Sequence, residues 1–203
     1  MEENEFRKLQ RYIVKRYQDQ TDEQVIAHIE KLNKKDPLSE DQWEELLASA
    51  CYYCCYHDEY TVFDYILTHV PTFHHIRHCV EATVRSQEKD YTYILKRINV
   101  LKRLLPYIGE EEKENILNES LLLASWYGLL GIVKFLIDQG ADIHYVGKQG
   151  KNAFEYAEIF YKRFADDTLY RYLKSYYESG TPLEDMESYY GIKKGLLKKL
   201  FKK

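Results

Sequence analysis

At 203 residues, with 45% hydrophobic and 31% charged residues, the chain has the composition of one folded globular domain and not of a disordered segment. The formal net charge of −4 is unevenly spread, because residues 191–203 carry six lysines and no acid, which leaves −10 for residues 1–190. A body of that charge repels phosphate backbones, so the sequence predicts no nucleic-acid partner outside the basic tail.

Residues 1–38 are expected to form an N-terminal helical cap. Apolar residues recur at helical spacing in two segments, at Phe6, Leu9, Ile13 and Tyr17 and then at Val25, Ile29 and Leu32. Thr21, followed three residues later by Gln24, predicts a capping box at the start of the second helix. The opening MEENEFRK lacks the apolar stretch of a secretory signal, and no run approaches the roughly 20 apolar residues of a membrane span. We therefore expect a cytoplasmic protein.

Residues 39–180 are expected to form helical hairpins in series. Ser39 predicts the start of a helix, and a second helix over residues 60–69 ends before Pro71. The same plan recurs in three further pairs, at residues 74–86 and 91–107, 120–127 and 131–138, and 153–164 and 167–178. One hairpin cannot bury its apolar face alone, so the sequence predicts an all-α solenoid of roughly four stacked pairs.

Cysteines and histidines gather in the first two of these pairs, at Cys51, Cys54, Cys55, His57, His74, His75, His78 and Cys79. A metal site or a cysteine nucleophile with a histidine base is the alternative that they raise. They stand inside predicted helices among apolar neighbours, and no enzyme signature surrounds a cysteine. The thiols are therefore expected to pack as small apolar residues. We predict no catalytic residue, no metal and no cofactor, with a cysteine/histidine-dependent enzyme or metal-binding protein as the alternative.

The acidic run at Glu110, Glu111, Glu112 and Glu114 is expected at a helix start. The helix dipole stabilises negative charge there. Metal binding is the other interpretation, but no spaced set of oxygen ligands accompanies the run. Glycine-rich phosphate-binding loops are absent from the sequence, which argues against nucleotide chemistry.

Residues 120–157, SLLLASWYGLLGIVKFLIDQGADIHYVGKQGKNAFEYA, contain paired small residues at Ala124 and Ser125, a turn glycine at Gly128 and the closing run 140–143, GADI. This segment resembles the ankyrin repeat, and the resemblance implies an ankyrin-repeat solenoid. Gly140 suits the left-handed residue that ends a helix. The next repeat opens with residues 152–155, NAFE, where the family prefers TPLH. This departure predicts weaker hydrogen bonds at that turn.

The resemblance also implies where a partner protein binds, because ankyrin repeats vary their concave face and projecting turns with the partner. The matching positions here are Trp126, Tyr127, Lys148, Gln149 and Lys151, and aligning residues 47–53 with 121–127 adds Tyr52 and Tyr53. Aromatic residues bury large areas with few torsions to freeze, which favours such a role. Packing of the same residues between repeats is the alternative interpretation.

Twenty tyrosines in 203 residues have two explanations, a compositional bias and a role in recognition. The diverged, tyrosine-rich repeats resemble those of ankyrin proteins that intracellular bacteria deliver into host cells. The sequence therefore predicts a monomeric protein-interaction module. The likeness to effectors implies action on a host protein in the host cytoplasm.

Residues 181–203 form a basic tail in which Ile192, Leu196 and Leu200 lie on one helical stripe. Such a segment suits docking on the acidic body as a C-terminal cap, an anionic membrane surface or an acidic partner. Gly195 lowers the helix propensity of the tail on its own.

Overall fold

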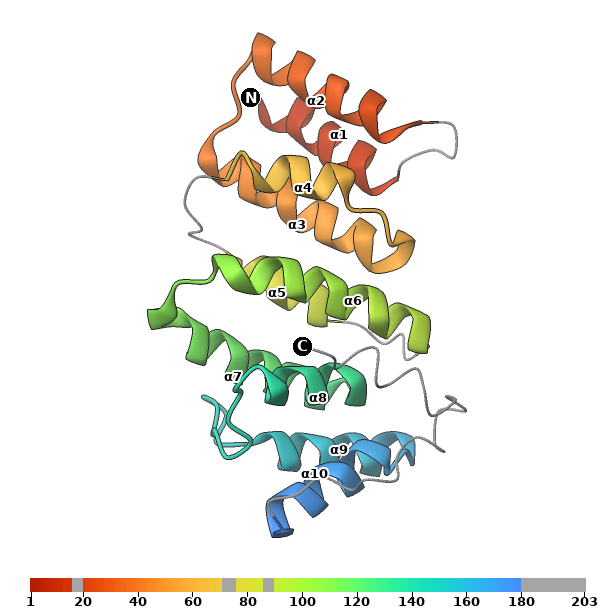
Figure 1. Ribbon diagram of the computed structural model, residues 1–203, viewed down its shortest axis with the longest axis vertical. Coiled ribbons are helices and arrows are strands. Elements are labelled where there is room, and N and C mark those ends of the chain that lie inside the picture. The colour runs from red at the N-terminus through yellow and green to blue at the C-terminus, as the bar shows by residue number, and fades with distance from the viewer. Residues whose placement is uncertain (16–19, 71–75, 86–89, 180–203) are drawn as a thin grey trace. The chain divides into compact units, whose positions relative to one another are not determined.

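The computed structural model describes residues 1–15, 20–70, 76–85 and 90–179 (Figure 1). Regular structure within these ranges consists of ten α-helices and one short 3-10 helix, with no β-strand, which confirms the all-α prediction. None of the described helices is long and apolar enough to cross a membrane. The basic tail, residues 181–203, lies outside the described residues.

The chain divides into two compact units. Unit 1 comprises Met1–Thr83 and Asn99–Ile108, and unit 2 comprises Val84–Ile98 and Gly109–Lys203. The division passes through α5 (Ile76–Val84) and α6 (Tyr91–Leu104), which continues into the 3-10 helix η1 (Leu105–Tyr107). The N-terminal helices therefore share a unit with the first predicted hairpin.

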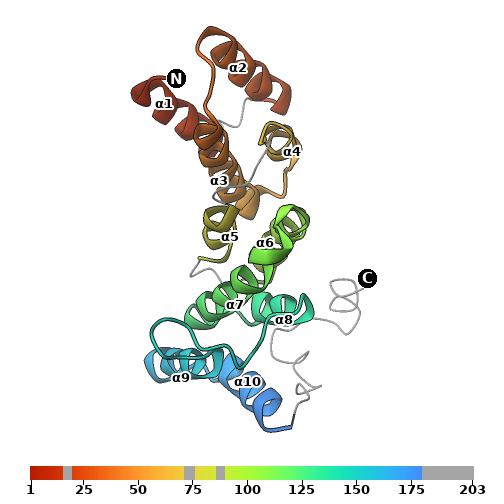
Figure 2. The same cartoon turned by 90° about the vertical axis from the view of Figure 1, so that its left-hand side faces the viewer.

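Unit 1 contains two helix pairs that pack in chain order. α1 (Glu3–Val14) packs on α3 (Glu40–His57), α2 (Asp22–Lys35) packs on α4 (Thr61–Leu67), and α3 also contacts α4 (Figure 2). Phe6, Leu9 and Ile13 are buried between α1 and its neighbours, which confirms the predicted apolar face. Tyr17, the fourth residue of that face, lies outside the described residues.

Capping boxes start both α2 and α3. The Thr21 hydroxyl accepts from the Gln24 amide at 3.4 Å, and the Gln24 side chain accepts from the Thr21 amide at 3.0 Å. Ser39 and Gln42 repeat this exchange at 3.3 and 3.2 Å. The predicted helix starts at Thr21 and Ser39 are thus confirmed, because each cap satisfies amides that the first helical turn leaves without partners.

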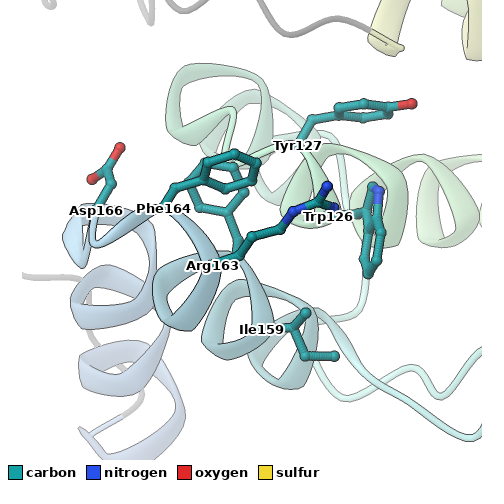
Figure 3. Close-up of a pocket in the computed structure, with 7 residues that line it drawn as sticks. Trp126, Tyr127, Ile159, Arg163, Phe164 and Asp166 are labelled. Carbon is teal, nitrogen blue, oxygen red and sulfur yellow. The ribbon is translucent and has the colours of Figure 1, made fainter.

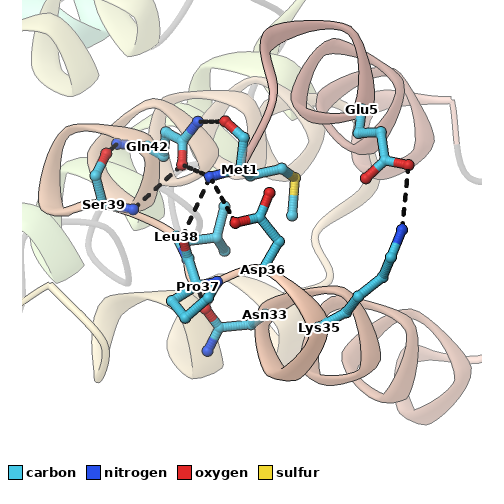
Figure 4. A network of polar contacts seen from close by, with 9 residues as sticks. All are labelled: Met1, Glu5, Asn33, Lys35, Asp36, Pro37, Leu38, Ser39 and Gln42. Atoms are coloured by element: carbon cyan, nitrogen blue, oxygen red, sulfur yellow. Dashed lines mark hydrogen bonds and ion pairs between the residues drawn. The ribbon is translucent and has the colours of Figure 1, made fainter.

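The connection from α2 to α3 is fixed on the start of α1 (Figure 4). The Met1 amine donates to the Pro37 carbonyl at 3.2 Å and lies 3.5 Å from the Asp36 carboxylate. Gln42 completes the network, since its side chain accepts from the Met1 amine at 3.3 Å and donates to the Met1 carbonyl at 2.9 Å. These contacts join the start of α1 to the end of α2 and to the first turn of α3.

Unit 2 is built around α7 (Glu110–Trp126), which packs against both α8 (Leu130–Asp138) and α9 (Ala153–Phe164). α9 packs in turn against α10 (Thr168–Ser179), and Figure 2 shows α7 and α9 on one side of the unit with α8 and α10 on the other. α7 begins ten residues before the predicted helix over 120–127. Its first turn is the acidic run, and buried Ile116 and Leu117 continue the apolar face between the two predicted features.

The turn before α9 departs from the prediction. The Asn152 side chain accepts from the Glu155 amide at 2.9 Å, and the Glu155 carboxylate accepts from the Asn152 amide at 2.9 Å. The predicted weakening of this turn is therefore wrong. Asparagine caps a helix as well as threonine does, and the glutamate returns the second hydrogen bond.

Gly128, in the turn between α7 and α8, permits the packing of α9 on α7. Its φ is +70°, a left-handed conformation, and a Cβ built on it would lie 2.5 Å from the Phe160 ring. Phe160 is 6% exposed, so the ring has little space into which to retreat. Glycine is required here both by backbone conformation and by the close approach of Phe160.

We expect Gly128→Ala to destabilise the chain by about 2 to 4 kcal/mol, because strain and overpacking add. Gly150→Ala is the matched control, since Gly150 has nearly the same φ, +69°, but no atom within 4 Å of a built Cβ, and it should cost only about 1 kcal/mol. Urea unfolding measures both values. Equal losses from the two substitutions would show that the contact with Phe160 contributes nothing.

Asn152→Ala is expected to lower the free energy of unfolding by about 1 kcal/mol, because it removes the side-chain half of the capping box. Asn152→Ser, which keeps a capping oxygen, should retain most of the stability. Thermal unfolding of the two variants beside the wild type checks this. An alanine variant as stable as the wild type would contradict a role for the cap.

Candidate functional site

Trp126 ends α7 with an unusual exposure for a tryptophan. The two small residues before it, Ala124 and Ser125, are fully buried, and the helical rotation then carries Trp126 outward to 40% exposure. Its ring meets that of Tyr156 on α9 edge to face, with centroids 5.8 Å apart and planes at 87°. The indole is therefore held on α9 while much of it stays accessible.

One pocket opens between α7 and α9, beside Trp126, and we name it the Arg163 pocket. It has a volume of about 410 Å³ and is lined by Trp126, Tyr127, Ile159, Phe160, Arg163, Phe164 and Asp166. Figure 3 shows Arg163 reaching from α9 toward Trp126. The Arg163 guanidinium lies 5.1 Å from the centroid of the Phe164 ring, within cation–π range.

A second pocket, the Lys148 pocket, lies on the other side of the same tryptophan. It has a volume of about 460 Å³ and is lined by Glu119, Leu122, Leu123, Trp126, Gly147, Lys148, Gln149 and Tyr156. Trp126 therefore belongs to both pockets. We call the two pockets together with Trp126 the Trp126 surface.

The turn between α8 and α9 presents Lys148 and Gln149. It closes on itself, since the Gly147 amide donates to the Lys151 carbonyl at 3.0 Å, and Gly150, with φ +69°, adopts a left-handed conformation within the turn. The Tyr156 hydroxyl donates to the Gln149 side chain at 3.1 Å. Burial raises the pKa of Tyr156, with Glu119 and Glu155 adding to the shift, so the phenol keeps its proton for this bond.

The structure gathers four of the seven predicted contact residues, Trp126, Tyr127, Lys148 and Gln149, at the Trp126 surface. Lys151 lies at the base of the same turn and lines neither pocket. The sequence interpretation missed the contribution of α9, namely Tyr156, Ile159, Arg163 and Phe164. Tyr156, Ile159 and Arg163 are three and four residues apart, which marks one helix face, and Phe164 follows directly; the sequence alone would equally assign this signal to core packing.

The two predicted contact residues in unit 1, Tyr52 and Tyr53, differ in how much of each side chain is exposed. Tyr52 is 48% exposed, like its counterpart Trp126, but Tyr53 is only 7% exposed. The Tyr53 hydroxyl donates to Glu59 at 2.8 Å, and its ring stacks on His57 with centroids 4.2 Å apart. α3 continues five residues beyond Tyr52, to His57, whereas α7 ends at the aligned Trp126, and the continuation of α3 places the His57 ring on Tyr53. A partner could reach Tyr52 but not Tyr53.

The four cysteines are all buried free thiols. Burial raises the pKa of Cys51, so it stays a neutral thiol, and the Cys54 thiol donates to the Glu59 carbonyl at 2.9 Å. His78 is exposed while the adjacent Cys79 is buried, which divides the second predicted cluster. His74 and His75 lie outside the described residues. In the part of the chain that the structure describes, no three His, Cys, Asp or Glu side chains are grouped so that they could hold a metal ion.

Comparison with known proteins adds no further assignment. No protein-family model, no curated protein and no solved structure matches the chain. The Trp126 surface is therefore interpreted from its own geometry. It combines exposed aromatic rings, an arginine and two adjoining pockets, and aromatic residues and arginine are enriched at protein interfaces in general.

All four thiols should react slowly with a disulfide reagent at pH 8 in the native chain, at least about 100-fold more slowly than in guanidinium chloride, because reaction requires opening of the fold. Because the folded pKa of Cys51 is raised, moving to pH 9 should not expose a fast-reacting thiolate there. Absorbance of the released reagent measures both rates. One rapidly reacting native thiol would reopen the cysteine-enzyme alternative.

Proposed function

We propose that this chain is an ankyrin-type repeat protein that binds a partner protein through the Trp126 surface. The repeat assignment is supported by the segment after α8. Gly140 is left-handed, Ala141 and Ile143 are buried around exposed Asp142, and the Asp142 amide donates to buried Asn118 at 2.7 Å. A helix pair closed by such a turn and followed by a second pair is the arrangement that the resemblance implies.

The observation that carries the proposal is the 40% exposure of Trp126 between two pockets. Exposing a tryptophan costs hydrophobic free energy that burial would recover. Tryptophan and arginine are the residues that most often dominate binding energy when they lie at the centre of an interface. Here Trp126 and Arg163 share one pocket, so a partner would bury both together.

The alternative is a cysteine/histidine-dependent enzyme or a metal-binding protein. Such a protein needs accessible thiols or a set of converging ligands. The burial of all four cysteines favours the interaction protein instead. We infer action in the cytoplasm, which is the host cytoplasm if the chain is a delivered effector. The proposed membrane contact of the tail concerns residues that lie outside the described residues.

Trp126→Ala is expected to reduce capture of the partner from cell lysate by about tenfold or more, because it removes the aromatic anchor of the surface. Tyr161→Ala is the matched control, since Tyr161 is 39% exposed on α9 in the same unit and lines neither pocket. Quantitative mass spectrometry of proteins captured by the full chain and both variants measures the effect. Urea unfolding of each variant checks that the fold is kept. Captured proteins that both variants retain equally would contradict the proposed surface.

A further inference from the structure

Two cationic side chains line the pockets on either side of Trp126, and a third cationic residue lies close to one of them in the sequence. Arg163 lines one pocket, Lys148 lines the other, and Lys151 lies on the same turn as Lys148. Among the described residues, no carboxylate forms an ion pair with any of the three. This gathering contrasts with the net charge of −10 on residues 1–190.

The two acids that line the pockets are engaged within the fold. Glu119 accepts from the Tyr145 hydroxyl at 2.9 Å, and Asp166 accepts from the Thr168 amide at 3.2 Å, near the start of α10. Figure 3 shows Asp166 on the far side of Phe164 from Arg163. The two carboxylates thus accept hydrogen bonds from groups within the fold, while Arg163 and Lys148 line the pockets and form no ion pair with an acid in the part of the chain that the structure describes.

The Arg163 pocket is lined by apolar side chains as well as by the guanidinium. Phe164 is 56% exposed, and Ile159 and buried Phe160 complete the lining. A volume of about 410 Å³ is in the range of pockets that enclose a ligand group. An apolar side chain in the pocket would exclude water from the guanidinium, and exclusion of water strengthens its attraction for a carboxylate.

We propose that the partner presents an acidic peptide segment with one aromatic or aliphatic side chain, which enters the Arg163 pocket while neighbouring carboxylates meet Arg163 and Lys148. This inference rests on the proposed function, because it specifies the chemistry of the same surface. Arginine suits this role, since its planar fork matches a carboxylate in two parallel hydrogen bonds. Lys148 and Lys151 on the turn extend the positive charge past Trp126, where the segment leaves the pocket.

Selection of a random peptide library against the full chain, with Trp126→Ala as the counter-selection, tests the inference. We expect the peptides that require Trp126 to carry Asp or Glu beside an apolar residue. Peptides that require Trp126 but are neutral or basic would overturn the inference and leave the proposed function standing. A selection that yields no Trp126-dependent peptide would overturn both.

A charge reversal then tests the role of Arg163 on the best selected peptide. Arg163→Glu should weaken binding by about tenfold, and replacing the peptide carboxylates by lysines should recover binding to this variant only. Arg171→Glu is the control, because Arg171 is exposed on α10 in the same unit, lines neither pocket and gives the same change in net charge. Titration followed by tryptophan fluorescence measures each affinity. Equal weakening by the two substitutions would reduce the effect to overall charge and overturn the assignment.

Discussion

The close approach of Phe160 to Gly128 is the contact on which the arrangement of unit 2 depends. A side chain on Gly128 would lie 2.5 Å from the Phe160 ring, so only glycine lets α9 settle against the end of α7. That position brings Tyr156 to Trp126 and places Arg163 and Phe164 on the far wall of the pocket. The Arg163 pocket is thus a consequence of helix packing, whereas the turn between α8 and α9 completes the Lys148 pocket.

The tyrosine-rich composition divides between packing and exposure. On α9 and α10, Phe154 stacks with both Tyr170 and Tyr177, at 5.1 and 5.8 Å between centroids, and Tyr161 stacks with Tyr170 at 5.5 Å. These residues are seven apart on each helix, so two turns bring each ring back to the same face. Much of the aromatic content of unit 2 therefore joins neighbouring helices, and Trp126 is distinguished by the pockets beside it.

The two aligned aromatic pairs show why a local pattern does not fix a contact surface. Tyr52 and Trp126 are both exposed, as their shared position after two buried small residues requires. Tyr53 is enclosed because α3 continues past it, whereas Tyr127 follows the last residue of α7 and lines the Arg163 pocket. The two helices have almost the same length, 18 and 17 residues, but they end at different positions relative to the aligned aromatic pair, and this difference sets what covers the second residue.

The sequence alone determined the helix starts at Thr21 and Ser39, the buried face of α1 and the left-handed glycine at residue 140. Each of these features depends on residues within a few positions of one another along the chain. Tertiary structure alone decided that Arg163 and Phe164 face Trp126, since more than 30 residues separate them along the chain. The periodicity of α9 is the same whether that face enters a core or borders a pocket. Only the packing against α7 selects between these outcomes.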